Sequence, residues 1–215
     1  MKQNIHVYWT ILEPLLAHLI HNNRKDYIQQ RKNIIYAYRN ELLSKDLACC
    51  LNDQDFKNTP HGKPYLLNYP DFSFNHSHSQ NFYVLATSRD VQNLGIDIEE
   101  LSRKVRFDAL AQHAFHPEEL KTWQTLAYEP EYWFKVWTTK EAVLKASGLG
   151  IRINLNELNT NIHPEQNGGR CEHPEIGVYA YQNYTLADCM LTVAWQIEHS
   201  CKGLRFPVIQ IHQAV

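Results

Sequence analysis

The stretch Leu94-Gly95-Ile96-Asp97-Ile98-Glu99-Glu100 alternates apolar and acidic residues near the middle of the chain. This alternation predicts a β-strand, because successive side chains of a strand point to opposite faces. Ile96 and Ile98 are expected to face the core, so that Asp97 and Glu99 share the other face with Cα atoms about 6.6 Å apart. Two carboxylates at that separation can converge on one hard cation such as Mg²⁺, although an acidic, solvated strand end has the same pattern.

A second informative stretch is Trp133-Phe134-Lys135-Val136-Trp137-Thr138-Thr139-Lys140-Glu141-Ala142-Val143-Leu144-Lys145, which predicts a helix over residues 131–147. At about 100° per residue, Lys140, Glu141 and Lys145 fall on the same face as the tryptophans. An ordinary surface helix separates charged from aromatic residues. The mixture predicts a functional face, or else local pairing of Glu141 with Lys145 and lysine stems that cover apolar surface. The opposite, bland face carries Lys135, Thr139, Ala142 and Ala146.

Outward from these stretches, strand and helix patterns occur in mixed clusters, which indicates the α+β class. Strands are expected over residues 5–12, 65–67, 72–74, 82–86, 94–98, 176–181, 186–195 and 208–211. Helices are expected over 14–21, 24–51, 106–114 and 131–147, with another beginning at 116, and breaker residues predict loops at 58–64 and 161–175. A soft boundary near residue 103 predicts an N-terminal α+β half, 1–102, and a C-terminal α+β half, 103–215.

Length and composition exclude several classes of protein. The chain has 215 residues, 21 Lys and Arg against 23 Asp and Glu, and 44% hydrophobic residues. These values are typical of globular proteins and argue against disorder and against bulk binding of nucleic acid. No apolar run is long enough for a transmembrane helix, and the N-terminus does not have the pattern of a secretory signal.

Five cysteines and twelve histidines raise the question of disulfides and metal sites. The odd number of cysteines and the absence of a signal pattern favour reduced thiols in a cytoplasm. His76 and His78 are two residues apart, and so are Cys171 and His173. Neither pair comes with a second pair at zinc-finger spacing. The histidines are therefore expected to be scattered over surface and core.

Three shorter segments add to the pattern. Asn75-His76-Ser77-His78-Ser79 offers hydroxyl and imidazole groups that suit a phosphate, although Asn and Ser are also typical of turns. Gly62-Lys63-Pro64-Tyr65 fixes a lysine in a loop. Phe115-His116-Pro117-Glu118-Glu119 reads as a helix start, with an early proline and acidic residues in the first turn.

Taken in order, these segments resemble the 4′-phosphopantetheinyl transferase superfamily, in particular its surfactin-synthetase-activating (Sfp) type. The resemblance rests on Gly62-Lys63-Pro64, on Asn75 to Ser79, on Gly95-Ile96-Asp97-Ile98-Glu99, on Phe115 to Glu119, and on Trp137-Thr138-Thr139-Lys140-Glu141-Ala142-Val143-Leu144-Lys145. It implies two similar α+β halves related by a pseudo-twofold axis, with coenzyme A in the cleft between them. It also implies transfer of phosphopantetheine from coenzyme A to a serine of an apo acyl or peptidyl carrier protein, which releases adenosine 3′,5′-bisphosphate.

The resemblance further implies a role for each matching residue. Asp97, Glu99 and Glu141 would be the Mg²⁺ ligands. Lys145 would stabilise or protonate the leaving phosphate, and Glu119, or its neighbour Glu118, would be the base for the serine hydroxyl. The expected contacts with coenzyme A are Lys63, Ser77, His78, Lys140 and Arg31, the last from a basic run that also reads as a solvated helix face. His76, where the family often has an apolar residue, could add a phosphate contact or face water.

Two other functions remain open at this stage. The carboxylates could serve another Mg²⁺-dependent phosphohydrolase, or the chain could be a non-catalytic module that binds coenzyme A or a carrier protein. The resemblance favours a monomer, the cysteine count and the lack of a signal pattern favour the cytoplasm, and charge and hydropathy argue against nucleic acid and membrane partners. The carrier protein is not identified by any motif.

Overall fold

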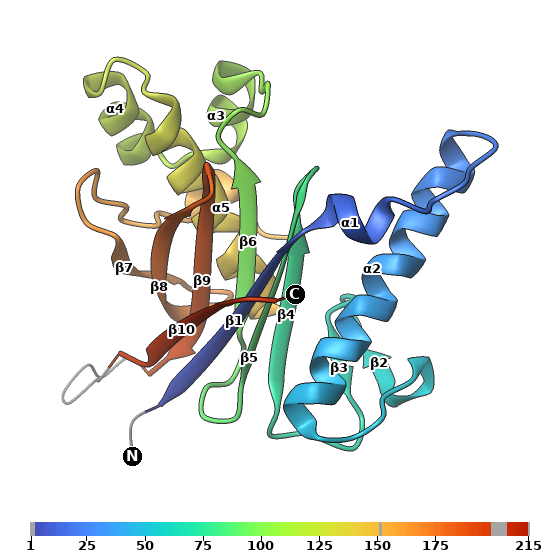
Figure 1. Ribbon diagram of the computed structural model, residues 1–215. Coiled ribbons are helices and arrows are strands. Elements are labelled where there is room, and N and C mark those ends of the chain that lie inside the picture. Colours follow the sequence, from blue (N-terminus) through green and yellow to red (C-terminus); the bar gives the residue numbers. More distant parts are fainter. Residues whose placement is uncertain (1–2, 151, 199–205, 215) are drawn as a thin grey trace.

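Two four-stranded sheets form the framework of the protein in a computed structural model that describes residues 3–150, 152–198 and 206–214 (Figure 1). The first sheet has the order β10-β1-β5-β4, and its strands are β1 (Asn4–Ile11), β4 (Ser73–His78), β5 (Phe82–Ser88) and β10 (Val208–Gln213). The second has the order β6-β9-β8-β7, and its strands are β6 (Gly95–Glu100), β7 (Gly168–His173), β8 (Gly177–Leu186) and β9 (Cys189–Ile197). β1 and β10 are parallel, and the other neighbours are antiparallel.

The two sheets share an apolar core. Val7 of β1 and Val84 of β5 pack in one cluster with Ile96, Ile98 and Val193 of the second sheet. Ile96 and Ile98 are thus core residues, as the alternation in β6 predicts, and burying such side chains stabilises the fold by about 1.5–3 kcal/mol each. This shared core fixes β6 beside β4 and β5, and so holds the carboxylates of β6 next to the first sheet.

One long helix belongs to each sheet. Helix α2 (Arg24–Leu47) buries Ile35, Leu42 and Leu43 in a cluster with β5, and the side chain of Asn23 caps its N-terminus by accepting a hydrogen bond from the amide of Asp26. The shorter elements are α1 (Leu12–Leu16), α3 (Phe107–Ala114), α4 (Pro117–Thr125), and the hairpin of β2 (Phe56–Asn58) and β3 (Pro64–Leu66). Figure 1 shows α2 on one side of the sheets and α3, α4 and α5 on the other.

Helix α5 (Pro130–Ser147) lies so close to β6 that one glycine is required between them. A Cβ on Gly95 would lie 2.0 Å from the carbonyl oxygen of Ala142 and 2.5 Å from the amide nitrogen of Ala146, so no larger residue fits without moving the helix. The helix is enclosed on nearly all sides. The residues of the bland face, Lys135, Thr139, Ala142 and Ala146, are all buried.

The α+β class is confirmed, but one predicted loop was wrong. Strand β7 lies within the loop predicted at 161–175, where Gly168 and Gly169 read as chain breakers. Gly169 serves a different purpose, since a Cβ there would lie 2.2 Å from the hydroxyl oxygen of Tyr181. Residues 75–78, predicted as a polar segment ahead of a strand, are themselves the last four residues of β4.

Two strands lie across the predicted boundary at residue 102. β6 precedes it but belongs to the second sheet, and β10 follows it but pairs with β1 in the first sheet. The division into 1–102 and 103–215 and the pseudo-twofold axis stay predictions. Each sheet thus contains one strand from the other part of the chain, and these strands join the N-terminal and C-terminal parts.

Candidate functional site

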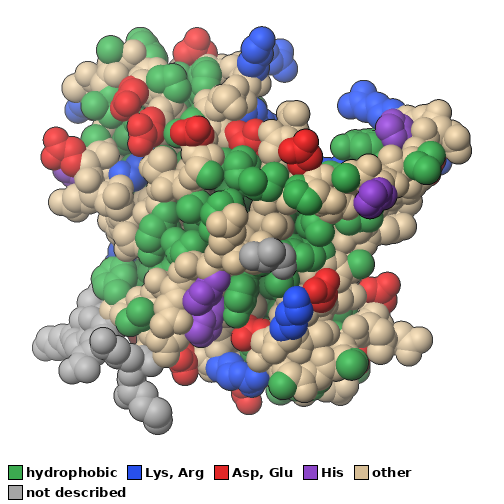
Figure 2. All heavy atoms as spheres, viewed as in Figure 1, with side chains coloured by type: hydrophobic (Ala, Val, Ile, Leu, Met, Phe, Trp, Pro, Cys, Tyr) green, Lys and Arg blue, Asp and Glu red, His purple; other side chains and the backbone are tan. Residues whose placement is uncertain are grey.

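A cleft of about 1290 Å³ opens between α2 and the ends of β4 and β6. Six of the residues predicted from the sequence line it, and they come from α2, β4, β6 and α5: Arg31, Ser77, His78, Asp97, Glu99 and Lys145. Figure 2 shows the surface hollowed between α2 and the side of α3 and α4, with basic side chains on both sides of the hollow. The fold therefore gathers residues that are far apart in the sequence.

Asp97 is the centre of the polar contacts at the floor of this cleft. Its Oδ1 atom accepts hydrogen bonds from Lys145 Nζ at 2.6 Å and from Ser77 Oγ at 2.8 Å, and Lys145 Nζ also donates to Ser77 Oγ at 2.8 Å. The second oxygen, Oδ2, is buried without a hydrogen-bond partner among the described residues. Leaving a buried carboxylate oxygen unpaired is costly, so this oxygen is ready to receive a cation or a donor from a ligand.

Two further carboxylates are close enough to Asp97 to repel it. Burial, and then the charge of Asp97, raises the pKa of Glu141 to about 6. Burial also raises the pKa of Glu99, against the opposing hydrogen bond from Arg103. Mutual repulsion of this kind is relieved by a shared cation. Among the described residues, however, no group of three His, Cys, Asp or Glu side chains is already arranged to hold a metal ion.

Further basic groups lie on the wall of the cleft formed by α2 and the end of β4. Arg31 Nη2 donates to the backbone carbonyls of Ser79 at 2.8 Å and Gln80 at 3.2 Å, and burial followed by the charge of Arg31 lowers the pKa of His78. Glu100 holds the same loop from the other side, because its carboxylate accepts hydrogen bonds from Ser79 Oγ and from Asn81. The loop after β4 is thus fixed between a cation and an anion.

Lys63 and Glu141 line a smaller pocket of about 220 Å³ that adjoins the cleft. Lys63 Nζ donates to the carbonyls of Leu94 at 3.0 Å and Ala146 at 2.7 Å, so it caps the C-terminal turn of α5. Burial lowers the pKa of Lys63 to about 8. His76 and Lys145 line both cavities and join them.

His76 is neither an exposed residue nor one that faces only water. Its ring packs against Tyr36 at 5.9 Å and Tyr83 at 5.8 Å, and its Nδ1 atom is buried without a partner among the described residues. Burial, and then the nearby cations Arg39 and Lys145, lowers the pKa of His76 to about 3. The imidazole is therefore neutral and stands between the cleft and the adjoining pocket.

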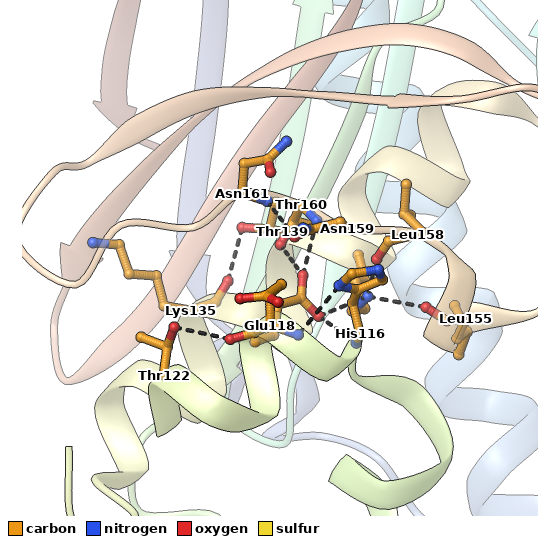
Figure 3. A network of polar contacts seen from close by, with 12 residues as sticks. His116, Glu118, Thr122, Lys135, Thr139, Leu155, Leu158, Asn159, Thr160 and Asn161 are labelled. Carbon is orange, nitrogen blue, oxygen red and sulfur yellow. Dashed lines mark hydrogen bonds and ion pairs between the residues drawn. The ribbon is translucent and has the colours of Figure 1, made fainter. Parts of the chain in front are cut away.

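Glu119 and Lys140 are not brought to the cleft. They form an ion pair of 2.9 Å between α4 and α5, and their side chains are 2% and 1% exposed. Glu119 also accepts hydrogen bonds from the amides of His116 and Thr160, and Lys140 donates to the carbonyls of Leu155 and Leu158 (Figure 3). The predicted roles as base and phosphate contact would require this pair to separate. Glu118, the other candidate for the base, is exposed.

Several residues of the cleft were missed by the sequence reasoning. Arg103 and Lys104 line it from the segment after β6, and Tyr27 and Tyr36 line it from α2. The basic pair directly after an acidic strand was the signal available for the first two. Its use requires knowing that the chain turns back toward β6, which the sequence pattern does not specify.

Comparison with known proteins bears on this arrangement. Residues 93–193, which include β6, α5 and Glu119, match the sequence model of the 4′-phosphopantetheinyl transferase superfamily. The family resemblance is confirmed. The segment from the acidic strand to β9 is thus the part of the chain in which the superfamily is recognised, and it contains Asp97, Glu99, Glu141 and Lys145.

Individual relatives agree. A putative 4′-phosphopantetheinyl transferase of Synechocystis is 31% identical over 141 residues, which cover 63% of this chain and 55% of that protein. The 4′-phosphopantetheinyl transferase Sfp of Bacillus subtilis is 28% identical over 129 residues, covering 58% and 54%. The transferase HetI of Nostoc is 38% identical over 95 residues, covering 43% and 39%. The chain spans about half the length of the curated relatives it matches. Among the described residues, no helix is long and apolar enough to cross a membrane.

Proposed function

We propose that this chain transfers 4′-phosphopantetheine from coenzyme A to a serine of an apo acyl or peptidyl carrier protein. The observation that carries the proposal is the meeting of Asp97, Glu99 and Lys145 at the floor of a cleft whose other wall presents Arg31 and His78. Carboxylates and cations gathered around one cleft suit a pyrophosphate that is held by a metal ion and by basic groups. The similarity to named transferases supports the same reaction.

In this reaction the serine oxygen attacks the phosphorus that carries the pantetheine arm, and the bond from that phosphorus to the bridging oxygen breaks. Adenosine 3′,5′-bisphosphate leaves, and the serine proton passes to a base. Lys145 would stabilise the negative charge that develops on the leaving phosphate. Ser77 and His78 would bind phosphate oxygens beside it, and Arg31 would hold the loop that presents His78.

The side chains fit a divalent cation. Asp97 Oδ2 is a buried oxygen without a partner, and Glu99 and Glu141 are near enough to Asp97 for the charges to interact. Oxygen donors of this kind are those that Mg²⁺ prefers. We propose that Asp97, Glu99 and Glu141 hold Mg²⁺, which would neutralise pyrophosphate charge when bound.

The test is to incubate the purified chain with coenzyme A, Mg²⁺ and a panel of apo carrier proteins, and to record the mass of each carrier. A gain of one phosphopantetheine on the serine of at least one carrier is expected, together with release of adenosine 3′,5′-bisphosphate. Release of phosphate or nucleotide without any carrier would instead favour a phosphohydrolase. Stoichiometric binding of coenzyme A without transfer would favour a binding module.

Glu141→Gln tests the proposed ligand set within this assay. The substitution keeps the shape of the side chain but removes its charge, and we expect the rate to fall by about 100-fold or more. Glu157→Gln is a suitable control, because Glu157 lies outside both cavities, in the short 3₁₀ turn Leu155–Glu157. Wild-type turnover in Glu141→Gln would remove Glu141 from the proposed ligands.

A further inference from the structure

Two of the three β6 carboxylates that line the cleft are paired with cations of the chain itself. Asp97 is paired with Lys145, and Glu99 is paired with Arg103. The second pair arises because the chain turns directly after β6, where the amide of Arg103 donates to the carbonyl of Glu100 at 3.0 Å. The turn brings the guanidinium of Arg103 back beside Glu99, on the cleft wall that faces α2.

The two internal cations are held to very different degrees. Lys145 Nζ donates to Asp97 and Ser77 and also contacts the carbonyl of Ile96, and its side chain is 29% exposed. The side chain of Arg103 is 49% exposed and that of Glu99 is 15% exposed, and among the described residues the side chain of Arg103 contacts only Glu99. Ion pairs of such exposed side chains contribute little to stability. Arg103 can therefore leave its partner easily, whereas Lys145 cannot.

Resting on the proposed function, we propose that Arg103 is a displaceable counter-cation that pairs with Glu99 in the absence of a divalent ion and binds substrate phosphate in its presence. A divalent ion carries twice the charge of a guanidinium and so competes effectively for Glu99. The released guanidinium has a planar fork of donors that matches phosphate oxygens. Arg31 and Lys32 lie on the α2 wall of the same cleft, so Arg103 would meet the phosphates from the other side.

This exchange makes opposite predictions for two ligands. Arg103→Gln removes the competitor for Glu99, so Mn²⁺ should bind about threefold to fivefold more tightly than to the wild type. The same variant lacks a phosphate contact, so coenzyme A in the presence of Mn²⁺ should bind about fivefold more weakly. A general loss of structure would weaken both ligands, so the opposite signs separate the proposed role from misfolding.

The experiment measures Mn²⁺ binding by electron paramagnetic resonance and coenzyme A binding by calorimetry, on the whole chain without a carrier protein. Lys104→Gln is the matched control, because Lys104 lines the same cleft wall and its loss changes the net charge equally. Since a charge without a direct contact is largely screened, Mn²⁺ affinity in the control should change by less than about twofold. Equal Mn²⁺ affinity in Arg103→Gln and Lys104→Gln, or unchanged coenzyme A affinity in Arg103→Gln, would overturn the proposal.

Arg103→Lys keeps the test decisive if the glutamine variant does not fold. It retains the charge beside Glu99 but lacks the planar fork, so Mn²⁺ affinity should stay near the wild-type value while coenzyme A binding weakens. Full coenzyme A affinity in this variant would contradict the phosphate role. The two proposals can fail separately. If the wild-type chain modifies no carrier protein but Arg103→Gln still binds Mn²⁺ more tightly than the wild type, the counter-cation proposal stands and the transferase proposal falls.

Discussion

Lys140 and Lys145 lie on the same helix, α5, and each forms an ion pair, yet their surroundings differ. Lys140 is 1% exposed, and its pair with Glu119 is enclosed by backbone amides and carbonyls from the segments around His116, Leu155 and Thr160. Lys145 is 29% exposed, and its pair with Asp97 lies at the floor of a large cleft. The buried pair Lys140–Glu119, here called the closed pair, joins parts of the fold. The pair Lys145–Asp97, here called the open pair, offers charge to a ligand.

The largest expected effect comes from breaking the closed pair. Lys140→Met leaves the Glu119 carboxylate buried without its counter-charge, which should lower the free energy of unfolding by about 3–5 kcal/mol. Urea unfolding at pH 7 measures this value. The double variant Glu119→Gln with Lys140→Met should be less destabilised than Lys140→Met alone, because the neutral amide still accepts hydrogen bonds from Thr160 and His116.

A destabilisation of the single variant below about 1 kcal/mol would mean that the pair is exposed to water in solution. It would also favour the sequence prediction that Glu119 and Lys140 act on substrate. The comparison between the two lysines would then no longer hold, because both pairs would be open.

Breaking the open pair should affect the transferase rate more than the stability. Lys145→Met should lower the transferase rate by about 100-fold, because the cation beside the leaving phosphate is lost. Its unfolding free energy should fall by less than that of Lys140→Met, because Ser77 still donates to Asp97 and the cleft gives water access to the position of the lost amine. Carrier mass gain and urea unfolding, recorded for the same preparation, test both statements, and Lys121→Met in exposed α4 is the control. A stability loss as large as that of Lys140→Met would contradict the distinction.

The sequence predicts the local part of this site better than the assembled one. Alternation placed Ile96 and Ile98 in the core, and this follows from strand geometry alone. The helical wheel of α5 placed Lys140 on one face with Glu141 and Lys145. The structure separates them, because Lys140 is buried against α4 and the segment 155–160, whereas Glu141 and Lys145 line cavities.

The contacts of Lys63 and Arg103 show the same limit. The contact of Lys63 with coenzyme A stays a prediction from its motif; in the structure its amine donates to the carbonyls of Leu94, before β6, and of Ala146, near the end of α5. Arg103 contacts Glu99 because a hydrogen bond from the amide of Leu101 to the backbone carbonyl of Asp188 holds the turn after β6. Both contacts depend on tertiary packing between distant segments, which periodicity and residue spacing do not encode.

The smallest expected effect concerns His76, which lies between the two cavities and belongs to neither pair. Its folded-state pKa is lowered to about 3, whereas the unfolded chain takes up the proton near pH 6.5. The unfolded state therefore binds more protons between these values, so stability is fully present above pH 6.5 and falls as the pH decreases. The loss attributable to His76 should reach about 2 kcal/mol at pH 5.

His76→Phe should remove this contribution while filling the space between Tyr36 and Tyr83. Urea unfolding at pH 7 and at pH 5 should then show a smaller decrease for the variant than for the wild type, by about 2 kcal/mol. His113→Gln, on an exposed face of α3, is the control and should follow the wild type. Parallel decreases in wild type and His76→Phe would mean that the imidazole becomes protonated in the folded protein. His76 would then have to be counted with the cations of the cleft, beside Lys145, instead of as a neutral wall between the cavities.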